Sequence, residues 1–285
     1  MPGRLEDKVA FITGIGSSGP GWGTGKAIAA TFAAEGASVF GLDKSEQAAA
    51  ETKAIIEQGG GRCTVFQGDA TSAADVGRAV DLCAGIYGRV DILVNNIGIG
   101  APGGVVEQSE ESWDEVFAVN LKSAFHTCKR CIPLMIDGGG GAIVNIASIA
   151  AVRWVGVPMI SYASSKAAMI QMTKHIALQH ARQKIRANVI LPGLIHTPMI
   201  VEPLTKHYGA DVPRLLDIRD KACPGGKMGD AHDVAYAALY LASDEAKFVS
   251  GAELTVDGGI CNQVAAPEDS LNAANDGRAA AAVRQ

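Results

Sequence analysis

The chain has 285 residues, of which 48% are hydrophobic, and its 25 Lys and Arg against 30 Asp and Glu give a formal net charge of −5. The apolar share is sufficient for a sizeable core, and the absence of a Lys/Arg cluster excludes the basic surface of a protein that binds nucleic acid or a membrane surface. No uninterrupted apolar run is long enough to span a bilayer, and the first residues are too acidic for a secretory signal, so a cytoplasmic location is expected.

Short β-rich runs alternate with longer helical runs along the chain. Unbroken apolar runs are typical of strands buried on both faces of a sheet, and apolar residues at helical spacing predict helices. In chain order, the pattern predicts strand Val9–Thr13, helix Gly25–Glu35, strand Ser38–Leu42, helix Ser45–Gln58, strand Cys63–Gln67, helix Ala73–Tyr87, strand Asp91–Asn95, helix Glu110–Ile136, strand Ala142–Ala147, helix Ser161–Arg182, strand Arg186–Leu191, helix Ala231–Ala242 and strand Glu253–Val256. We expect Pro133 to end or bend the long helix near its C-terminus.

Seven predicted strands separated by helices favour the α/β class, with a doubly wound, seven-stranded parallel sheet of the Rossmann type. No Pro/Ser-rich linker divides the chain into comparable halves, so a single domain is expected over residues 1–264. Residues 265–285 have weak periodicity and are predicted to form a loose or marginally helical extension.

A glycine-rich turn, Thr13–Gly25, follows the first predicted strand and leads into a helix. Glycines there let the backbone approach a pyrophosphate, and the N-terminus of the helix offers free N–H groups and a favourable dipole. Asp43 ends the next strand, where a carboxylate can accept hydrogen bonds from a ribose diol and repel a 2′-phosphate, which favours NAD over NADP. Two alternatives stay open: Asp43 is a surface residue that starts the next helix, or the adjacent Lys44 weakens the exclusion of the phosphate.

Neither the cysteines nor the histidines are spaced like metal ligands. Cys128 and Cys131 form one C-x-x-C in a predicted helix, without a second pair or a His at ligand spacing, so the six cysteines are interpreted as reduced, partly buried thiols. The six histidines are interpreted as surface or hydrogen-bonded residues, and no metal site is predicted.

Motifs at the predicted strand ends resemble, in order and placement, those of the short-chain dehydrogenase/reductase family over residues 5–260. Thr13-Gly14 with Gly23-x-Gly25 is similar to the glycine motif of the family, although this chain carries extra residues, near Ser18–Trp22, inside the loop. The other similar motifs are Asp69 after the third strand, Asn95-Asn96-Ile97-Gly98, Asn120 in the long helix, Ser148 after the fifth strand, Tyr162-x-x-x-Lys166, Pro192-Gly193-x-x-x-Thr197 and Val256-Asp257-Gly258-Gly259.

Tyr162 and Lys166 lie four residues apart and therefore project from one face of the predicted helix. A free phenol has a pKa of about 10, and a neighbouring ammonium lowers that pKa. Tyr162 is therefore suited to exchange a proton with an alcohol or ketone oxygen while hydride moves. The resemblance implies that Ser148 holds the same oxygen, that Lys166 also binds the nicotinamide ribose, and that Asn120 supports a water linking Lys166 to solvent.

The resemblance also implies the contacts of the cofactor and the substrate. The implied cofactor-binding residues are Gly14, Ser17, Ser18, Gly23, Thr24, Gly25, Asp43, Asp69, Ala70, Asn96, Gly98, Tyr162, Lys166, Pro192, Gly193, Ile195 and Thr197. On the substrate side the candidates are Trp154, Met159 and His196, with core packing as the alternative for the first two. The irregular segment Ile200–Pro224 has the length of a lid over the site.

The expected function is therefore NAD-dependent interconversion of a secondary alcohol and a ketone. An NADPH-dependent 3-oxoacyl-thioester reductase is the alternative among enzymes, and a non-catalytic dinucleotide-binding regulatory protein is the alternative outside that class. The resemblance further implies a homotetramer, in which the helices predicted at Glu110–Ile136 and Ser161–Arg182 make the larger contacts. A small-molecule substrate is expected, with no nucleic-acid or membrane partner.

Overall fold

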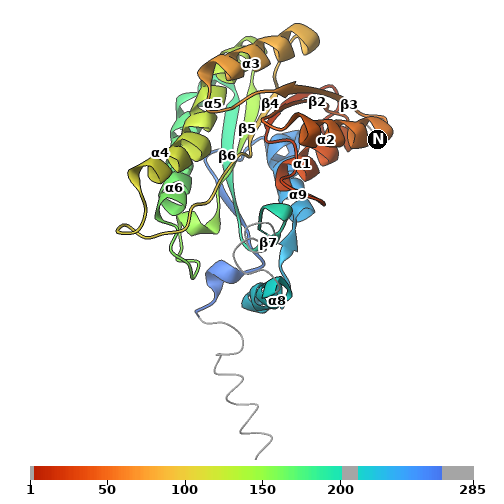
Figure 1. Ribbon diagram of the computed structural model, residues 1–285. Coiled ribbons are helices and arrows are strands. Elements are labelled where there is room, and N and C mark those ends of the chain that lie inside the picture. Colours follow the sequence, from red (N-terminus) through yellow and green to blue (C-terminus); the bar gives the residue numbers. More distant parts are fainter. Residues whose placement is uncertain (1–2, 201–210, 265–285) are drawn as a thin grey trace, which may run out of the picture.

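The computed structural model describes residues 3–200 and 211–264, which form a seven-stranded sheet with helices on both faces (Figure 1). Its strand order is β3-β2-β1-β4-β5-β6-β9, and every neighbouring pair runs parallel. The strands are β1 (Val9–Thr13), β2 (Ser38–Asp43), β3 (Arg62–Gln67), β4 (Ile92–Asn95), β5 (Gly141–Ile146), β6 (Ile185–Pro192) and β9 (Glu253–Val256). The doubly wound α/β class predicted from the sequence is confirmed.

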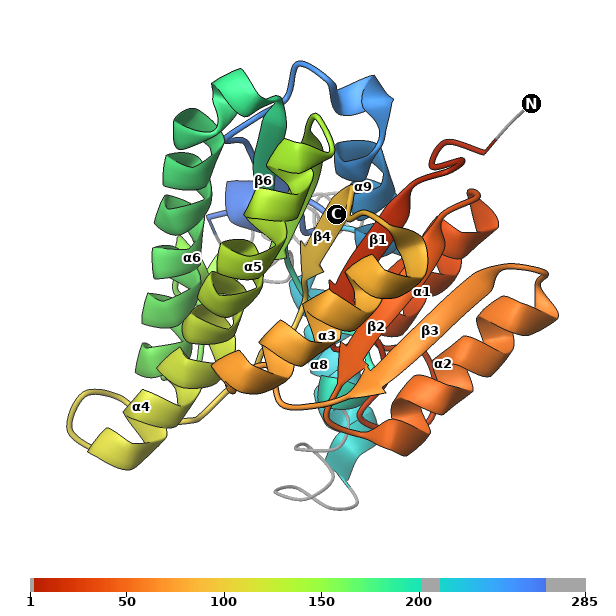
Figure 2. The ribbon, with the colours of Figure 1, turned by 90° about the horizontal axis from the view of Figure 1, so that it is seen from above.

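The helices form a layer on each face of the sheet (Figures 1 and 2). They are α1 (Thr24–Ala34), α2 (Glu46–Gln58), α3 (Ala73–Tyr87), α4 (Glu110–Phe117), α5 (Ser123–Asp137), α6 (Ile160–Gln179), α8 (Val212–Ala222) and α9 (Ala231–Ala242). Helices α1, α2 and α9 cover one face, and α3, α5 and α6 cover the other. Side chains at the N-termini of α2, α3, α4 and α9 accept hydrogen bonds from the first turn of each helix, which fixes where these helices begin.

Each face of the sheet has its own apolar core. On the α1–α9 face, Ile28 and Phe32 of α1 pack with Val234 of α9. On the other face, the rings of Phe11 and Phe40 stack with centroids 5.3 Å apart, under α3 and α5. Burying one such side chain contributes roughly 1.5–3 kcal/mol to folding, so the two layers hold the sheet rigid from both sides.

Four polar side chains cross the centre of the sheet in a continuous hydrogen-bonded chain. Asn95 of β4 and Asn145 of β5 are direct neighbours in the strand register, and Asn95 Nδ2 donates to Asn145 Oδ1 at 2.8 Å. Asn145 Nδ2 donates to Thr173 Oγ1 of α6 at 2.8 Å, and the Thr127 hydroxyl of α5 donates to Asn95 Oδ1. All four residues are buried, so these bonds satisfy groups that water cannot reach.

The single helix predicted over Glu110–Ile136 is wrong in one respect. A π-helical turn, Ala118–Lys122, separates α4 from α5, and the buried Asn120 lies in it. Wider turns of this kind are frequent at functional sites, because they redirect one side chain without ending the helix. Pro133 does not end the helix either, since α5 continues to Asp137 and the side chain of Met135 beyond it is fully buried.

The second half of the chain contains elements that the sequence pattern did not predict. A two-stranded parallel sheet joins β7 (Ile195–His196) to β8 (Gly229–Asp230). Helix α8 lies within the segment predicted as a lid, so the irregular structure expected there is wrong for residues 212–222, and the lid itself stays a prediction. Residues 201–210 of the same segment and the extension at 265–285 lie outside the described residues. Within the described ranges, no helix is both long and apolar enough to cross a membrane.

Candidate active site

The predicted site residues follow the carboxyl ends of neighbouring strands. The chain winds outward through β2 and β3 on one side of β1 and through β4, β5 and β6 on the other, so the strand order reverses between β1 and β4. In open α/β sheets, ligands bind outside the carboxyl ends of the strands at this reversal. Gly14 follows β1 and Asn96 follows β4, and Asn96 Nδ2 donates to the Gly14 carbonyl at 3.0 Å. The two loops that flank the reversal are thus joined.

The glycine-rich loop fits the pyrophosphate of a dinucleotide. Gly14 has a φ of +66°, and a Cβ on Gly25 would lie only 1.8 Å from the Gly14 carbonyl oxygen, so the backbones meet too closely for a side chain. Gly23 precedes the first residue of α1, and no side chain caps that end of the helix. The N–H groups of the first turn of α1 are therefore left for an external anion, in contrast to the capped ends of α2, α3, α4 and α9.

Asp43 lies at the end of β2 beneath this loop. Its Oδ2 accepts a hydrogen bond from Gly16 N at 2.8 Å, and its Oδ1 accepts one from Ser45 N at 2.9 Å. Ser45, and not Asp43, caps α2. The neighbouring Lys44 turns to Asp69, with its Nζ 3.2 Å from Asp69 Oδ2. The carboxylate of Asp43 is thus held against the glycine loop, and the adjacent cation is paired with another acid.

Asn120 is fully buried and holds the loop that follows β4. Its Oδ1 accepts from Ile99 N at 2.8 Å, and its Nδ2 donates to the Ile99 carbonyl and to Ser165 Oγ, each at 3.0 Å. Gly98, one residue earlier, lies against Lys166, because a Cβ there would be 3.0 Å from Lys166 Nζ. The π-helical turn thereby connects the β4 loop to the helix that carries Tyr162 and Lys166.

Ser148, Tyr162 and Lys166 meet at the end of β5. The Ser148 side chain lies close enough to the Tyr162 phenol to lower the pKa of Tyr162, but burial raises that pKa by more, so the net direction is upward. The sequence predicted the opposite direction from the nearby ammonium. Lys166 Nζ donates to the Ile146 carbonyl at 2.8 Å, and the residue is only 2% exposed. Burial lowers the pKa of Lys166 to about 8.

The segment after β6 lies beside this group. The Gly193 N–H donates to the Val256 carbonyl at 2.9 Å, and a Cβ on Gly193 would lie 2.6 Å from Asp257 Cβ, so this turn also requires glycine. Ile195 and Thr197 are buried, whereas the side chain of His196 is exposed. In this segment the side chains of Ile195 and Thr197 therefore point into the protein, and that of His196 points outward.

The substrate candidates have different environments. Trp154 is 73% exposed, which argues against the core-packing alternative for this residue. Met159 pairs with Gly103 in a short bridge, and its Cε would lie 2.7 Å from a Cβ on Gly100. Met159 thus connects the loop after β4 to the start of α6, where Tyr162 lies.

Two site residues were missed by the sequence analysis. The Thr13 hydroxyl accepts from Asn96 N at 3.2 Å, and Ser165 Oγ accepts from Asn120 and donates to the Tyr162 carbonyl at 2.9 Å. Ser165 lies inside the Tyr162-x-x-x-Lys166 motif, directly before Lys166. That position could have marked it as a site residue, but the spacing of the motif gives no role to the residues between Tyr162 and Lys166.

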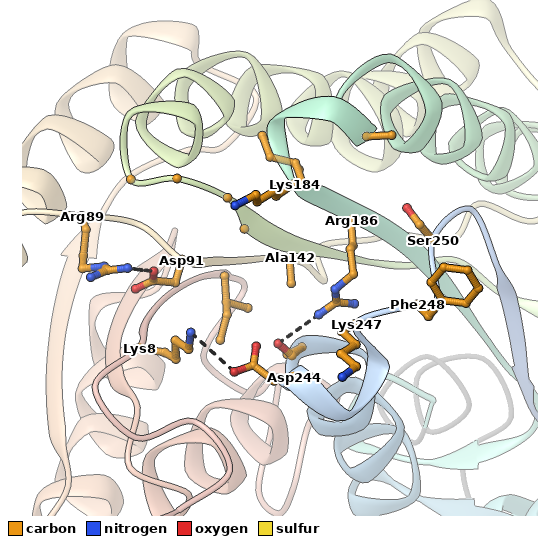
Figure 3. Close-up of a pocket in the computed structure, with 18 residues that line it drawn as sticks. Lys8, Arg89, Asp91, Ala142, Lys184, Arg186, Asp244, Lys247, Phe248 and Ser250 are labelled. Carbon is orange, nitrogen blue, oxygen red and sulfur yellow. Dashed lines mark hydrogen bonds and ion pairs between the residues drawn. The ribbon is translucent and has the colours of Figure 1, made fainter.

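A basic hollow lies at the other end of the sheet (Figure 3). Most of its charged groups are already paired: Arg89 with Asp91, Lys8 with Asp244, and Arg186 with the carbonyls that end α9. Because it opens beside the amino ends of β1, β4, β5 and β6, it is separate from the residues described above.

The cysteines and histidines of the described residues form neither a disulfide nor a metal site. All six cysteines are free, five of them are buried, and burial raises the pKa of Cys128 to about 12. Within residues 3–200 and 211–264, no three His, Cys, Asp or Glu side chains come close enough together to hold a metal ion.

Known proteins are similar to this chain in sequence and in fold. A family profile described as enoyl-(acyl carrier protein) reductase matches residues 19–261. A 2,5-dichloro-2,5-cyclohexadiene-1,4-diol dehydrogenase from Sphingobium indicum is 38% identical over 259 residues, which cover 91% of this chain and 98% of that enzyme. A 3-oxoacyl-[acyl-carrier-protein] reductase from Thermotoga maritima is 36% identical over 258 residues, which cover 90% and 99% of the two chains.

A solved structure agrees with these relatives. A protein from Burkholderia xenovorans assigned to the short-chain dehydrogenases/reductases has a TM-score of 0.89 and 46% identity, over 92% of this chain and 100% of that chain. The fold and its strand-end motifs define a nicotinamide-dinucleotide oxidoreductase. The chain belongs to the short-chain dehydrogenase/reductase family.

Proposed function

We propose that this protein is an NAD-dependent dehydrogenase that interconverts a secondary alcohol and a ketone. The observation that carries the proposal is the approach of Ser148 to Tyr162 at the end of β5, with the buried Lys166 one helical turn away. The uncapped end of α1 lies at the same edge of the sheet, after β1, with β4 between β1 and β5. A bound nicotinamide ring accepts or supplies the hydride. The residues of the chain bind the substrate oxygen and move its proton.

In this proposal, Ser148 and Tyr162 share the substrate oxygen. Ser148 donates a hydrogen bond to it, and Tyr162 removes the alcohol proton or returns it to the ketone oxygen. Lys166 binds the nicotinamide ribose and stabilises the phenolate as it forms. Asn120 keeps Ile99 and Ser165 in place beside Lys166 and supports the water through which Lys166 exchanges protons with solvent.

The preference for NAD is supported by the surroundings of Asp43. Both oxygens of this carboxylate are held by backbone N–H groups below the glycine loop, so the charge stays where a 2′-phosphate would have to lie. Lys44 is the nearest candidate to neutralise such a phosphate, but its ion pair with Asp69 draws it away. The structure therefore supports acceptance of a ribose diol more than that of a phosphate.

Three measurements separate this proposal from its rivals. Turnover of a panel of secondary alcohols and ketones, followed at the NADH absorbance band with NAD(H) and NADP(H), is expected to favour NAD(H). Preferential reduction of acetoacetyl thioesters with NADPH would instead identify a 3-oxoacyl-thioester reductase, the activity named for the Thermotoga relative. Dinucleotide binding without turnover of any member of the panel would indicate the non-catalytic alternative.

We also propose a cytoplasmic homotetramer. Free, mostly buried thiols are typical of a reducing compartment. Phe117 of α4, Phe125 of α5 and Met172 of α6 line a shallow hollow on one face, and the 49% exposed ring of Phe125 adds apolar surface there that a second copy could cover. Sedimentation is expected to give a tetramer, and Phe125→Glu a smaller species. A wild-type monomer at micromolar concentration would contradict this assembly.

A further inference from the structure

The enlarged part of the glycine loop lies against the segment that follows β7. A methyl group on Gly19 would lie 3.4 Å from Pro198 Cβ, and one on Gly21 would lie 3.7 Å from Pro198 Cγ. Pro198 directly follows Thr197, the last residue of the segment proposed to hold the nicotinamide end of the cofactor. The extra residues near Ser18–Trp22 therefore rest on the segment that leaves the end of β6.

Trp22 anchors the other end of this loop between two helices. Its ring meets the ring of His232, the second residue of α9, edge to face with centroids 4.8 Å apart. Lys26 of α1 places its Nζ 5.5 Å from the centre of the same Trp22 ring. Lys26 is only 9% exposed and makes no ion pair with any described residue, so the indole face is the partner that the structure gives it.

These contacts join with the strand pairing of β7 and β8 to form a closed ring of contacts between the glycine loop, α9 and the segment after β7. Asp230 ends β8 and caps α9, two residues before His232. Strand β8 pairs with β7, and Gly229 N donates to the Leu194 carbonyl at 3.1 Å. From β7 the chain passes through Thr197 to Pro198 and so returns to the glycine loop. Trp22 is the residue through which the loop joins α9 and completes this ring.

We propose that Trp22 is a positioning residue that clamps the nicotinamide-binding segment, Ile195–Thr197, against the pyrophosphate loop. The inference rests on the proposed dinucleotide-dependent activity. The aromatic pair and the cation–π contact both stabilise the arrangement in which Trp22 lies between α1 and α9. Together they favour one arrangement of a glycine-rich loop that has few side chains of its own to hold it. Hydride transfer depends steeply on the placement of the reacting atoms, so loss of the clamp acts on turnover.

Trp22→Ala tests the clamp, with Trp22→Phe as the variant that keeps an aromatic ring. At saturating NAD, Trp22→Ala is expected to lower kcat at least tenfold. The Kd of ADP-ribose, which lacks the nicotinamide, is expected to change less than about twofold. Trp22→Phe is expected to restore kcat to within about threefold of wild type. Thermal melting of each variant checks that the fold is intact.

Tyr236→Ala serves as the matched control. The side-chain rings of Tyr236 and His232 have their centroids 6.3 Å apart. Tyr236 is 60% exposed on α9 and takes no part in the contacts that join the glycine loop to α9. Its kcat is expected to match wild type. An unchanged kcat for Trp22→Ala overturns the inference. Equal losses of NADH and ADP-ribose affinity at unchanged kcat would overturn it as well, since they would show that Trp22 only shapes the pyrophosphate loop.

The outcomes also separate this inference from the proposed function. A wild-type protein that binds neither NADH nor NADPH overturns the proposed function and the clamp together. A wild-type protein that binds and turns over, while Trp22→Ala behaves identically, overturns the clamp alone.

Discussion

Replacing Asp43 with Asn removes a charge at the end of β2 and keeps the shape of the side chain. The carboxylate accepts from Gly16 N and Ser45 N. An amide has one oxygen, which can keep one of these bonds, so the glycine loop is expected to stay in place. The expected change is in the choice between NAD and NADP.

The size of the change follows from two terms. Two unit charges 4 Å apart repel by about 1 kcal/mol in water, and a phosphate carries about −1.5 to −2, so Asp43 disfavours NADP by about 2 kcal/mol, or roughly 30-fold. A hydrogen bond to a charged group is about 1 kcal/mol stronger than one between neutral groups, so binding of the ribose diol weakens by roughly fivefold. Together, the kcat/KM ratio of NAD over NADP is expected to fall by roughly 100-fold.

Steady-state kinetics with both cofactors measure this ratio. Glu46→Gln is the matched control, because Glu46 is an exposed acid in the first turn of α2, three residues from Asp43, with no contact to the glycine loop. The control is expected to keep the wild-type ratio within about twofold. If Asp43→Asn leaves the ratio unchanged, or if Glu46→Gln shifts it equally, Asp43 does not read the ribose and the assignment is wrong.

Three further predictions concern the catalytic group. Tyr162→Phe is expected to lower kcat at least 100-fold while NADH binds as before, because the variant lacks the phenol proposed to move the proton; comparable rates would contradict the assignment. Burial lowers the pKa of Lys166 from 10.5 to about 8 in the folded protein. Between these two pKa values the unfolded state binds more protons than the folded state, so the free energy of unfolding rises with pH in that range. Urea unfolding at pH 7 and pH 10 is expected to show a gain of about 2.5 kcal/mol in wild type relative to Lys166→Met, and parallel changes would refute it. Asn120→Ala leaves the Ile99 backbone and the Ser165 hydroxyl without their buried partner, at a cost of about 3 kcal/mol, so its Tm is expected to fall by roughly 10 °C; an unchanged Tm would show that these bonds are replaced.

The sheet and its strand ends could be predicted from sequence because the signal is local. Each buried strand is a short apolar run, and β1 is buried at every position. Glycines, Asp43 and Asn96 follow such runs directly, so their place at the carboxyl edge follows from the parallel topology. The position of Tyr162 relative to Lys166 follows from helical geometry alone.

Features that depend on distant partners could not be predicted. The π-helical turn at Asn120 depends on Ile99, 21 residues away, and on Ser165, 45 residues away. Strands β7 and β8 have two residues each, too few for any periodicity. The direction of the pKa shift of Tyr162 was mispredicted because the sequence shows its charged neighbour but not its burial.

The hydrogen-bonded chain from Thr127 through Asn95 and Asn145 to Thr173 also bears on how the polypeptide assembles. Asn95 and Asn145 are 50 residues apart, and parallel strands so distant in sequence are slow to find their alignment. A slip of β5 against β4 by one residue would turn the Asn145 side chain to the opposite face of the sheet and strand several amide groups in a dry interior, at about 1–3 kcal/mol each. Misaligned pairings are therefore less stable than the native register. The buried hydrogen bonds between β4 and β5 thus favour the native register of these two strands during folding. That register sets the positions of Asn96 and Ser148, which follow them.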